Sequence, residues 1–156
     1  MIRHIKCNIF ESGADIICHQ VNCQGIMGSG VAKQVREKYP EVFQKYKASC
    51  QLAKDNPSGL LGGTQWIVTS DGIIVNLFAQ ENFGYDGKCY TDYKALKRCL
   101  KTVHLLMEEE KQKTIAFPYL MGCHRGGGSW DVVYKIIEEV FAYSDCEVLI
   151  CEYNGG

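Results

Sequence analysis

The sequence has 156 residues, a net charge of -1 at pH 7, 46% hydrophobic residues and 22% charged residues. This length suits a single domain with a buried core, and the composition is typical of a soluble globular protein. The near-zero net charge argues against a broad basic surface, so non-specific binding of duplex nucleic acid is not expected. A nucleotide-sized anion remains a feasible ligand, because helix N-termini and backbone N–H groups hold anions without net positive charge.

The nine cysteines do not follow a metal or disulfide spacing. No Cys-x-x-Cys pair occurs, and no histidine lies at zinc-finger distance from a cysteine. Cys18, Cys99 and Cys151 lie in apolar runs, where cysteine behaves as a small buried hydrophobe. We therefore expect free thiols, no metal and a reducing compartment. With no signal-peptide pattern and no run of the ~18 apolar residues that span a membrane, the sequence predicts a cytoplasmic protein.

The first half of the chain predicts strands and helices in alternation. Residues 2–6 alternate apolar and polar side chains, as an edge strand does, and residues 15–21 have the continuous apolar centre of a strand buried on both faces. Helical spacing follows from residue 31 to 39, and Pro40 ends that helix or begins the next, which continues to Ala53. Residues 56–59 predict a loop.

The second half adds a hairpin, two helices and two strands. Residues 64–69 and 73–78 predict strands joined by an Asp-Gly turn, and residues 80–90 predict a surface loop. A helix over 92–110 and a strand over 114–117 precede a glycine-rich loop. Ser129 is expected to cap a helix that ends at Phe141, and residues 147–151 predict a last strand. The core-facing positions of that helix are expected to be Val132, Val133, Ile136, Ile137 and Val140. The pattern predicts one layered α/β domain over residues 1–156 with a mixed sheet.

Two loops share the order apolar strand, glycine-rich turn, helix: residues 22–30 and residues 121–128. Ligands of α/β sheets bind outside the carboxyl ends of strands, where both loops are expected. One such loop fits a tight turn equally well, whereas two indicate a ligand with separated anionic and sugar-like parts, such as a dinucleotide-type diphosphate. The first loop lacks the Lys-Ser/Thr of a P-loop, and Lys33 breaks the Rossmann fingerprint, which argues against an ATPase or an NAD dehydrogenase.

Together, the two loops resemble those of the macrodomains, which bind ADP-ribose. The matching runs are VNCQGIMGSGVA from Val21 to Ala32, followed by Tyr39-Pro40, and PYLMGC from Pro118 to Cys123, followed by Gly126-Gly127-Gly128 and Trp130. The Met-Gly-x-Gly form with the following Tyr-Pro is similar to the branch of terminal ADP-ribose protein glycohydrolase, DNA ADP-ribosyl glycohydrolase antitoxins and yeast ADP-ribose-1″-phosphate phosphatase. The run Tyr90-Thr91-Asp92-Tyr93 is similar to bacterial and phage members of the Appr-1-p processing type. The resemblance covers nearly the whole chain. It implies a three-layer α/β/α fold around a mixed, mostly parallel sheet.

The resemblance also implies a ligand-binding role for particular residues. The glycines and helix start of the first loop are expected on one side of the diphosphate, with the second loop over the other side and the distal ribose. Ile9 and Tyr153 are expected beside the adenine, and Asn22 at the distal ribose. Asn8 replaces an aspartate that reads the adenine amino group in many macrodomains, so this bond lacks a charge. The implied ligand-binding set is Asn8, Ile9, Asn22, Gly28, Ser29, Gly30, Val31, Ala32, Gln80, Leu120, Gly122, Cys123, His124, Arg125, Gly126, Gly127, Gly128 and Tyr153.

Departures from the family pattern bear on catalysis. Glycohydrolases of this branch use a lysine and an aspartate at positions that match Gln80 and Gly126, so their covalent mechanism is not expected here. Lys88 is either a substitute or an ordinary solvated lysine. Cys23 and Cys123 flank the presumed site without the His–Asp arrangement of a thiol nucleophile.

His19 and Asn22 are the candidate catalytic residues. His19 matches a histidine of the yeast phosphatase and is either an acid/base near a bound phosphate or a histidine satisfied in the core. His124 and Arg125 either contact the ligand's terminal phosphate or distal ribose, or only shield the ligand. The aromatic residues Phe83, Tyr85 and Tyr90 form a lid or are ordinary loop residues.

These observations predict a monomeric hydrolase without a cofactor. It is expected to bind ADP-ribose or ADP-ribose-1″-phosphate and to hydrolyse the phosphate of the latter slowly. A non-catalytic reader of ADP-ribosylated macromolecules is one alternative, and an ADP-ribosyl-ester hydrolase acting on modified protein or nucleic acid is another. Neither a membrane nor duplex nucleic acid is expected as a direct partner.

Overall fold

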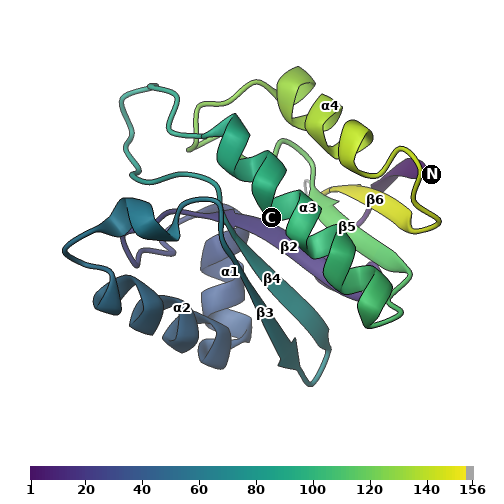
Figure 1. The fold of residues 1–156 in the computed structure, drawn as a ribbon, viewed down its shortest axis with the longest axis horizontal. Coiled ribbons are helices and arrows are strands. Elements are labelled where there is room, and N and C mark those ends of the chain that lie inside the picture. The colour runs from purple at the N-terminus through teal and green to yellow at the C-terminus, as the bar shows by residue number, and fades with distance from the viewer. Residues whose placement is uncertain (154–156) are drawn as a thin grey trace.

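A central sheet lies between two layers of helices in the computed structural model, which describes residues 1–153 (Figure 1). Its strand order is β1-β6-β5-β2-β4-β3, and only β3 runs antiparallel to its neighbour. The α/β fold with a mixed, mostly parallel sheet is therefore confirmed. The strands are β1 (Ile2–Lys6), β2 (Ile16–Val21), β3 (Thr64–Thr69), β4 (Gly72–Phe78), β5 (Thr114–Pro118) and β6 (Glu147–Glu152).

Helices α1 (Gly30–Lys38) and α2 (Pro40–Leu52) cover one face of the sheet, and α3 (Tyr93–Glu109) and α4 (Trp130–Val140) cover the other (Figure 1). Pro40 occupies the first turn of α2, where its missing N–H costs no helical hydrogen bond. Two short 3-10 helices, η1 (Ile9–Glu11) and η2 (Pro57–Leu60), complete the elements. The residues expected as a plain loop after α2 thus include one 3-10 helix.

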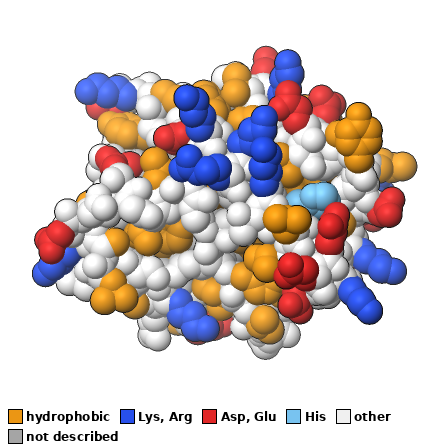
Figure 2. Space-filling view, viewed as in Figure 1, with side chains coloured by type: hydrophobic (Ala, Val, Ile, Leu, Met, Phe, Trp, Pro, Cys, Tyr) orange, Lys and Arg blue, Asp and Glu red, His pale blue; other side chains and the backbone are white. Residues whose placement is uncertain are grey.

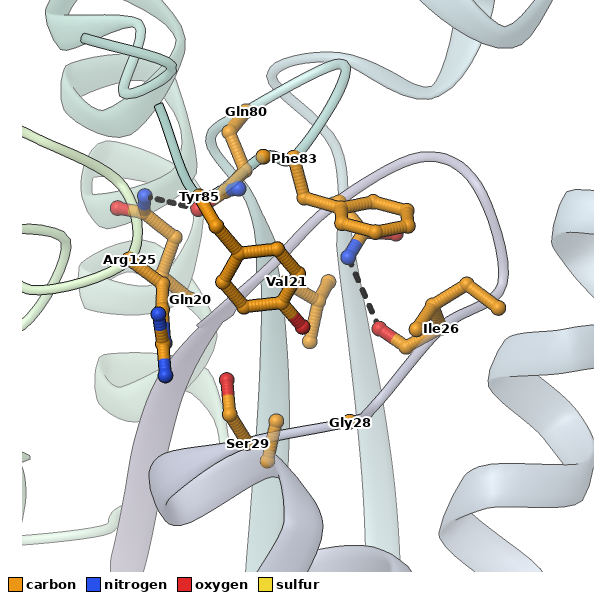
Figure 3. Close-up of a pocket in the computed structure, with 12 residues that line it drawn as sticks. Gln20, Val21, Ile26, Gly28, Ser29, Gln80, Phe83, Tyr85 and Arg125 are labelled. Atoms are coloured by element: carbon orange, nitrogen blue, oxygen red, sulfur yellow. Dashed lines mark hydrogen bonds between the residues drawn. The ribbon is translucent and has the colours of Figure 1, made fainter. Parts of the chain in front are cut away.

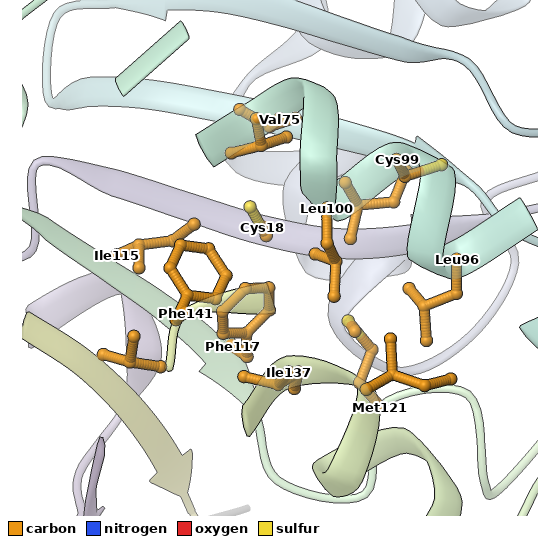
Figure 4. Close-up of a cluster of buried hydrophobic side chains, with 14 of the residues drawn as sticks. Cys18, Val75, Leu96, Cys99, Leu100, Ile115, Phe117, Met121, Ile137 and Phe141 are labelled. Carbon is orange, nitrogen blue, oxygen red and sulfur yellow. The ribbon is translucent and has the colours of Figure 1, made fainter. Parts of the chain in front are cut away.

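The sheet separates two hydrophobic cores, and β2 contributes to both. Ile16 and Cys18 of β2 pack under α3 and α4, whereas Ile17 and Val21 pack under α1 and α2. This alternation explains why β2 is apolar at consecutive positions. Figure 4 shows the first core, in which side chains of α3 and α4 close over β2, β4 and β5. Burying one such leucine or phenylalanine stabilises the fold by about 1.5–3 kcal/mol.

The helices α3 and α4 begin differently, and the start of α4 corrects two expectations. Asp92 caps α3, because its side chain accepts a hydrogen bond from the N–H of Ala95 at 2.9 Å. Ser129 lies at the N-cap position of α4, but its hydroxyl makes no capping bond. Its backbone N–H instead donates to the hydroxyl of Tyr93 at 2.9 Å. Val132, expected to face the core, is 39% exposed because it lies on the outer side of the first turn.

Many positively charged side chains gather in one region of the surface. Lys and Arg side chains gather over the first half of α3 in Figure 2, where Lys94, Lys97, Arg98 and Lys101 are exposed on one side of the helix. All nine cysteines are free thiols. Within the described residues, no helix combines the length and the apolarity that a bilayer crossing requires.

Candidate functional site

The two glycine-rich loops lie side by side because their strands are neighbours. β2 and β5 pair in parallel, so their carboxyl ends reach the same edge of the sheet. Loop 1 (residues 22–29) joins β2 to α1, and loop 2 (residues 119–129) joins β5 to α4. Gly30 begins α1 with φ +60°, a conformation that L side chains rarely adopt. Both loops therefore lie at the carboxyl ends of their strands, as the sequence predicted.

A continuous cleft runs between the two loops. It consists of three hollows with overlapping walls, since Ser29 and Gln80 line the first and the central hollow, and Val31 and Tyr119 line the central hollow and the last. The central hollow has a volume of about 640 Å³, which lies in the range of small-molecule sites. The cleft is therefore wide enough for a nucleotide-sized ligand.

One wall of the cleft is the start of α1. Residues 29–32 line the central hollow, and the first N–H groups of a helix have no partner within it. Ser29 occupies the N-cap position but its side chain makes no capping hydrogen bond. The N–H groups of the first turn therefore have no partner within the helix, and this is the arrangement that suits an anion.

Asn22 lines one end of the cleft and holds loop 1 in shape. Its Nδ2 donates to the carbonyl of Ile26 at 2.9 Å, and its Oδ1 accepts from the N–H of Gln24 at 2.9 Å. The hydroxyl of Tyr46 lies 2.7 Å from the same Oδ1. The residue expected at the distal ribose thus has its side-chain oxygen engaged within the protein, which leaves the second N–H of its amide for a ligand.

The opposite end of the cleft contains the residues expected around adenine. Asn8, Ile9 and Tyr153 line it together with Tyr119, whose ring packs edge-on against Trp130 at 5.2 Å. The Oδ1 of Asn8 accepts from the N–H of Phe10 at 3.1 Å and caps η1. This carbonyl oxygen therefore already has one protein donor before any ligand arrives.

Loop 2 rests on polar side chains from β2 and from the chain before α3. The Nε2 of Gln20 donates to Gln80 Oε1 at 2.8 Å and to Thr91 Oγ1 at 2.9 Å, and Thr91 donates in turn to the carbonyl of Gly122 at 2.7 Å. Gly122 has φ +76°, and a Cβ there would lie 2.7 Å from Gln20 Oε1. Only a glycine lets the loop approach this support so closely.

Gln80 and Gly126, the two positions that depart from the glycohydrolase pattern, both line the central hollow. Gln80 is 8% exposed and its amide is bonded to Gln20 and to the carbonyl of Asn82. A Cβ on Gly126 would lie 2.5 Å from both the Gly122 carbonyl and Thr91 Oγ1. Neither position offers a nucleophile or a carboxylate to the cleft.

His19 lines the floor of the central hollow and is only 1% exposed. Its Nε2 lies 2.6 Å from Asn76 Oδ1, and its Nδ1 has no hydrogen-bond partner among the described residues. Burial lowers the pKa of His19 from 6.5 to about 4, although the hydrogen bond to Asn76 works in the opposite direction. The imidazole is therefore neutral at physiological pH.

Aromatic residues of the loop 80–90 extend over one end of the cleft. Figure 3 shows the rings of Phe83 and Tyr85 opposite Gly28 and Ser29. The guanidinium of Arg125, from loop 2, lies 4.4 Å from the centre of the Tyr85 ring. This contact joins loop 2 to the loop 80–90 across the hollow. Tyr90, by contrast, bonds Asp86 within the loop 80–90.

Most of the predicted ligand-binding residues line the cleft, His124 and Leu120 among them. Cys123, Gly127 and Gly128 do not, and the thiol of Cys123 bonds the carbonyl of Met121 within loop 2. Lys88 is also outside it, with its side chain 77% exposed and near Asp86.

Gln20 and Tyr119 are among the residues of the cleft wall that were not expected from the sequence. A polar residue near the end of an apolar strand and an aromatic residue directly after a strand were the available signals. Both positions lie at carboxyl ends of parallel strands, where ligands of α/β sheets bind.

Nucleophilic thiol chemistry has no support in this geometry. Burial raises the pKa of the Cys23 thiol to about 12 and that of Cys123 to about 11, so neither is a thiolate at neutral pH. Within residues 1–153, no three His, Cys, Asp or Glu side chains come together in a metal-binding group.

Comparison with known proteins places this geometry in a family. The family model described as Macro domain matches residues 18–137, which include most of β2, both loops and most of α4. The chain belongs to the Macro domain family. The resemblance found in the two glycine-rich loops is thereby confirmed.

The relatives of this macro domain include proteins named as hydrolases. An ADP-ribose 1″-phosphate phosphatase of Meyerozyma guilliermondii is 31% identical over 58% of the chain and 53% of its own length. A DNA ADP-ribosyl glycohydrolase of Thermus aquaticus is 24% identical over 97% of the chain and 41% of its own length. The chain thus spans about half of these curated relatives or less.

A solved structure with the same fold was determined with a ligand. Thermosipho africanus DarTG in complex with ADP-ribose is 18% identical, with a TM-score of 0.80 over 97% of this chain and 41% of that one. At this identity the likeness establishes the fold.

Proposed function

We propose that this macro domain binds ADP-ribose and slowly hydrolyses the phosphate of ADP-ribose-1″-phosphate. The observation that carries the binding is the uncapped start of α1 in the cleft wall. Ser29 leaves the N–H groups of the first turn free, and these groups together with the positive end of the helix dipole suit a diphosphate. A DarTG with the same fold was solved with ADP-ribose, which supports this choice of ligand.

The shape of the cleft supports the same ligand. The end of the cleft lined by Ile9 and Tyr153 has apolar and polar surface and suits a base. The opposite end of the cleft, near Asn22 and Tyr85, suits a sugar. The wall between these ends carries α1. An extended ligand with a base, a diphosphate and a distal ribose matches this order of surfaces.

The phosphatase activity rests on His19 and on the yeast relative. The Meyerozyma guilliermondii protein is named as an ADP-ribose 1″-phosphate phosphatase, and His19 lies in the cleft floor of this chain. With a pKa of about 4, His19 is a poor base at neutral pH, which fits slow turnover. Asn22 is proposed to help position the attacking water.

A non-catalytic reader is the second candidate, and the replacement of the glycohydrolase lysine and aspartate by Gln80 and Gly126 favours it. Gln80 is held in amide hydrogen bonds, and Gly126 has no room for a side chain. A hydrolase of ADP-ribosyl esters on protein or nucleic acid is supported only by the names of glycohydrolase relatives. De-modification of ADP-ribosylated DNA and protein is expected to be negative.

Two measurements separate these functions. Calorimetric titration should show heat with ADP-ribose and none with ATP or NAD, and absence of heat with ADP-ribose would remove the binding proposal. Phosphate release from ADP-ribose-1″-phosphate, compared between wild type and His19→Ala, then distinguishes enzyme from reader. Equal release by both proteins would remove His19 from the mechanism, and no release by wild type would establish the reader.

A further inference from the structure

A row of three polar side chains crosses three strands next to the cleft, and two of them, His19 and Asn76, are buried. His19 of β2 lies opposite Asn76 of β4, and Asn76 lies opposite Gln65 of β3. His19 Nε2 is 2.6 Å from Asn76 Oδ1, and Asn76 Nδ2 is 3.0 Å from Gln65 Oε1. Asn76 is fully buried, so the oxygen and the NH₂ group of its amide depend on their neighbours in the row for hydrogen bonds.

The row ends on a group that can only accept hydrogen bonds. Gln65 Nε2 donates to the backbone carbonyl of Lys45 at 3.2 Å and to Ser49 Oγ at 2.8 Å, both on α2. A serine hydroxyl suits either orientation of the amide, but a backbone carbonyl requires the NH₂ group. The carbonyl of Lys45 therefore fixes the orientation of the Gln65 amide.

The orientation of the Gln65 amide determines that of the Asn76 amide, which in turn determines the tautomer of His19. Because Gln65 presents its oxygen to Asn76, Asn76 must present its NH₂ group there and its oxygen to His19. The nitrogen of His19 that faces this oxygen must then be N–H. Reversing any one amide would bring two acceptors or two donors together. Neutral His19 is thus restricted to the tautomer with hydrogen on Nε2 and a bare lone pair on Nδ1.

His19 is the member of the row that lines the central hollow, and its Nδ1 is buried beneath that surface. The two nitrogens of an imidazole point to different sides of the ring, so Nδ1 is turned away from β4. β5 lies on that side of β2, and residues 118–122 line the central hollow together with His19. Nδ1 is buried and without a partner among the described residues, and such an acceptor is unfavourable until a donor reaches it.

We propose that His19 Nδ1 is an acceptor site for one O–H group in the cleft, and that Asn76 and Gln65 are positioning residues that hold its lone pair ready. The O–H group belongs either to a ligand hydroxyl or to a bound water. A phosphate oxygen without a proton does not fit, because two acceptors would face each other. His19 therefore orients a hydroxyl or water and does not contact phosphate. The identity of the ligand in this inference rests on the proposed function. The tautomer of His19 does not depend on it.

The ¹⁵N chemical shifts of the His19 ring test the tautomer directly, because protonated and bare ring nitrogens have well separated shifts. Between pH 6 and 8, wild type without ligand should show hydrogen on Nε2 alone. Asn76→Asp keeps the acceptor and should preserve this tautomer while raising the pKa of His19. Gln65→Leu frees the Asn76 amide to reverse and should give a mixture of tautomers. A wild-type protein with hydrogen on Nδ1, or with a mixture, would overturn the proposal.

Gln65→Leu has a matched control in Thr64→Val, the preceding position of β3, whose side chain takes no part in the row. The control should keep the wild-type tautomer. Gln65→Leu should also weaken ADP-ribose binding about 2- to 10-fold, as expected for one poorly oriented hydrogen bond. If Gln65→Leu shows the wild-type tautomer, the positioning role fails even when His19 itself behaves as proposed.

Titration with ADP-ribose identifies the donor. A shift of Nδ1 toward the hydrogen-bonded value on ligand binding assigns the site to a ligand hydroxyl. A value that is already hydrogen-bonded in the free protein assigns it to water. An Nδ1 without a donor in both states contradicts the acceptor site. Because the tautomer is measured without ligand, failure of ADP-ribose to bind would remove the proposed function and leave the tautomer result standing.

Discussion

The hydroxyl of Tyr46, on α2, lies 2.7 Å from Asn22 Oδ1 at the edge of the cleft. Tyr46 is fully buried, and its ring stacks on Phe78 with 5.8 Å between centroids. Asn22 in turn bonds Gln24 and Ile26 within loop 1. The shape of a ligand-binding loop is thus determined from beneath by the hydrophobic core.

Tyr46→Phe should therefore weaken both the fold and the ligand site. Loss of this buried hydrogen bond is expected to lower the free energy of unfolding by about 1–2 kcal/mol and the ADP-ribose affinity about 2- to 10-fold. Tyr39→Phe is the matched control, because Tyr39 donates to Asp71 Oδ2 at 3.0 Å, outside the cleft lining. Denaturant unfolding and calorimetry measure the two effects. An unchanged affinity in Tyr46→Phe would show that loop 1 needs no such support.

Arg125 and Tyr85 should act together on ligand affinity. The guanidinium and the ring hold loops 80–90 and 119–129 against each other over one end of the cleft. Arg125→Ala and Tyr85→Ala are each expected to weaken ADP-ribose binding. The double variant should lose less than the sum of the two, by about 0.5–1 kcal/mol. Strict additivity in a double-mutant cycle measured by calorimetry would mean that the two residues contribute separately.

Burial of neutral His19 should make the protein sensitive to acid. Its pKa is about 4 in the folded chain and 6.5 ordinarily, so the unfolded chain takes up the proton first as pH falls. The stability from this group is complete above pH 6.5 and is lost between pH 6.5 and about 4, by about 3 kcal/mol at most. Asp15, whose pKa is lowered by the N–H groups of Lys113 and Thr114, adds a loss at lower pH. The two losses fall in different pH ranges.

The contribution of His19 is isolated by comparing wild type with His19→Gln. The difference between their unfolding free energies, measured from pH 7.5 to 4, should change in favour of the variant as the pH falls. Asp15 is present in both proteins, so its contribution cancels in this difference. A difference that does not vary with pH would contradict a neutral, buried His19.

Restoring the glycohydrolase residues should not create a glycohydrolase. A side chain on Gly126 meets the Gly122 carbonyl and Thr91 Oγ1 at 2.5 Å, so Gly126→Asp must displace loop 2. We expect Gln80→Lys with Gly126→Asp to be less stable than Gln80→Lys alone and to leave ADP-ribosylated DNA and protein unprocessed. Thermal unfolding and a de-modification assay check both points. Activity in the double variant would mean that loop 2 adapts more easily than its packing indicates.

Local patterns in the sequence predicted the elements and both glycine-rich loops. The apolar run of residues 16–21, the helical spacing of α3 and α4 and the Asp-Gly hairpin carry their own signals, because each depends on neighbours in the chain. Ser129 shows the limit of such signals, since its hydroxyl makes no capping hydrogen bond and its backbone N–H donates to the hydroxyl of Tyr93, 36 positions away. Val132 likewise departs from the helical pattern, since it is exposed whereas the next residue, Val133, is fully buried.

The partners of the site residues could not be predicted in this way. His19 and Asn76 are 57 positions apart, and they meet only because β2 pairs with β4 in one particular register. The support of Gly122 by Gln20 and Thr91 depends in the same way on the pairing of distant segments. The sequence therefore indicated which residues lie near the cleft, but not which of their polar atoms are already engaged.

The central claim is that the start of α1 binds the diphosphate of ADP-ribose, and Ala32→Glu tests it most directly. Ala32 lines the cleft in the first turn, where a carboxylate suits the helix dipole but repels a phosphate. Lys33→Gln makes the same change in net charge at the next residue, outside the cleft lining. By calorimetry, wild type and Lys33→Gln should bind ADP-ribose, and a folded Ala32→Glu should bind at least tenfold more weakly. Equal binding by all three proteins, or none by wild type, would contradict the account.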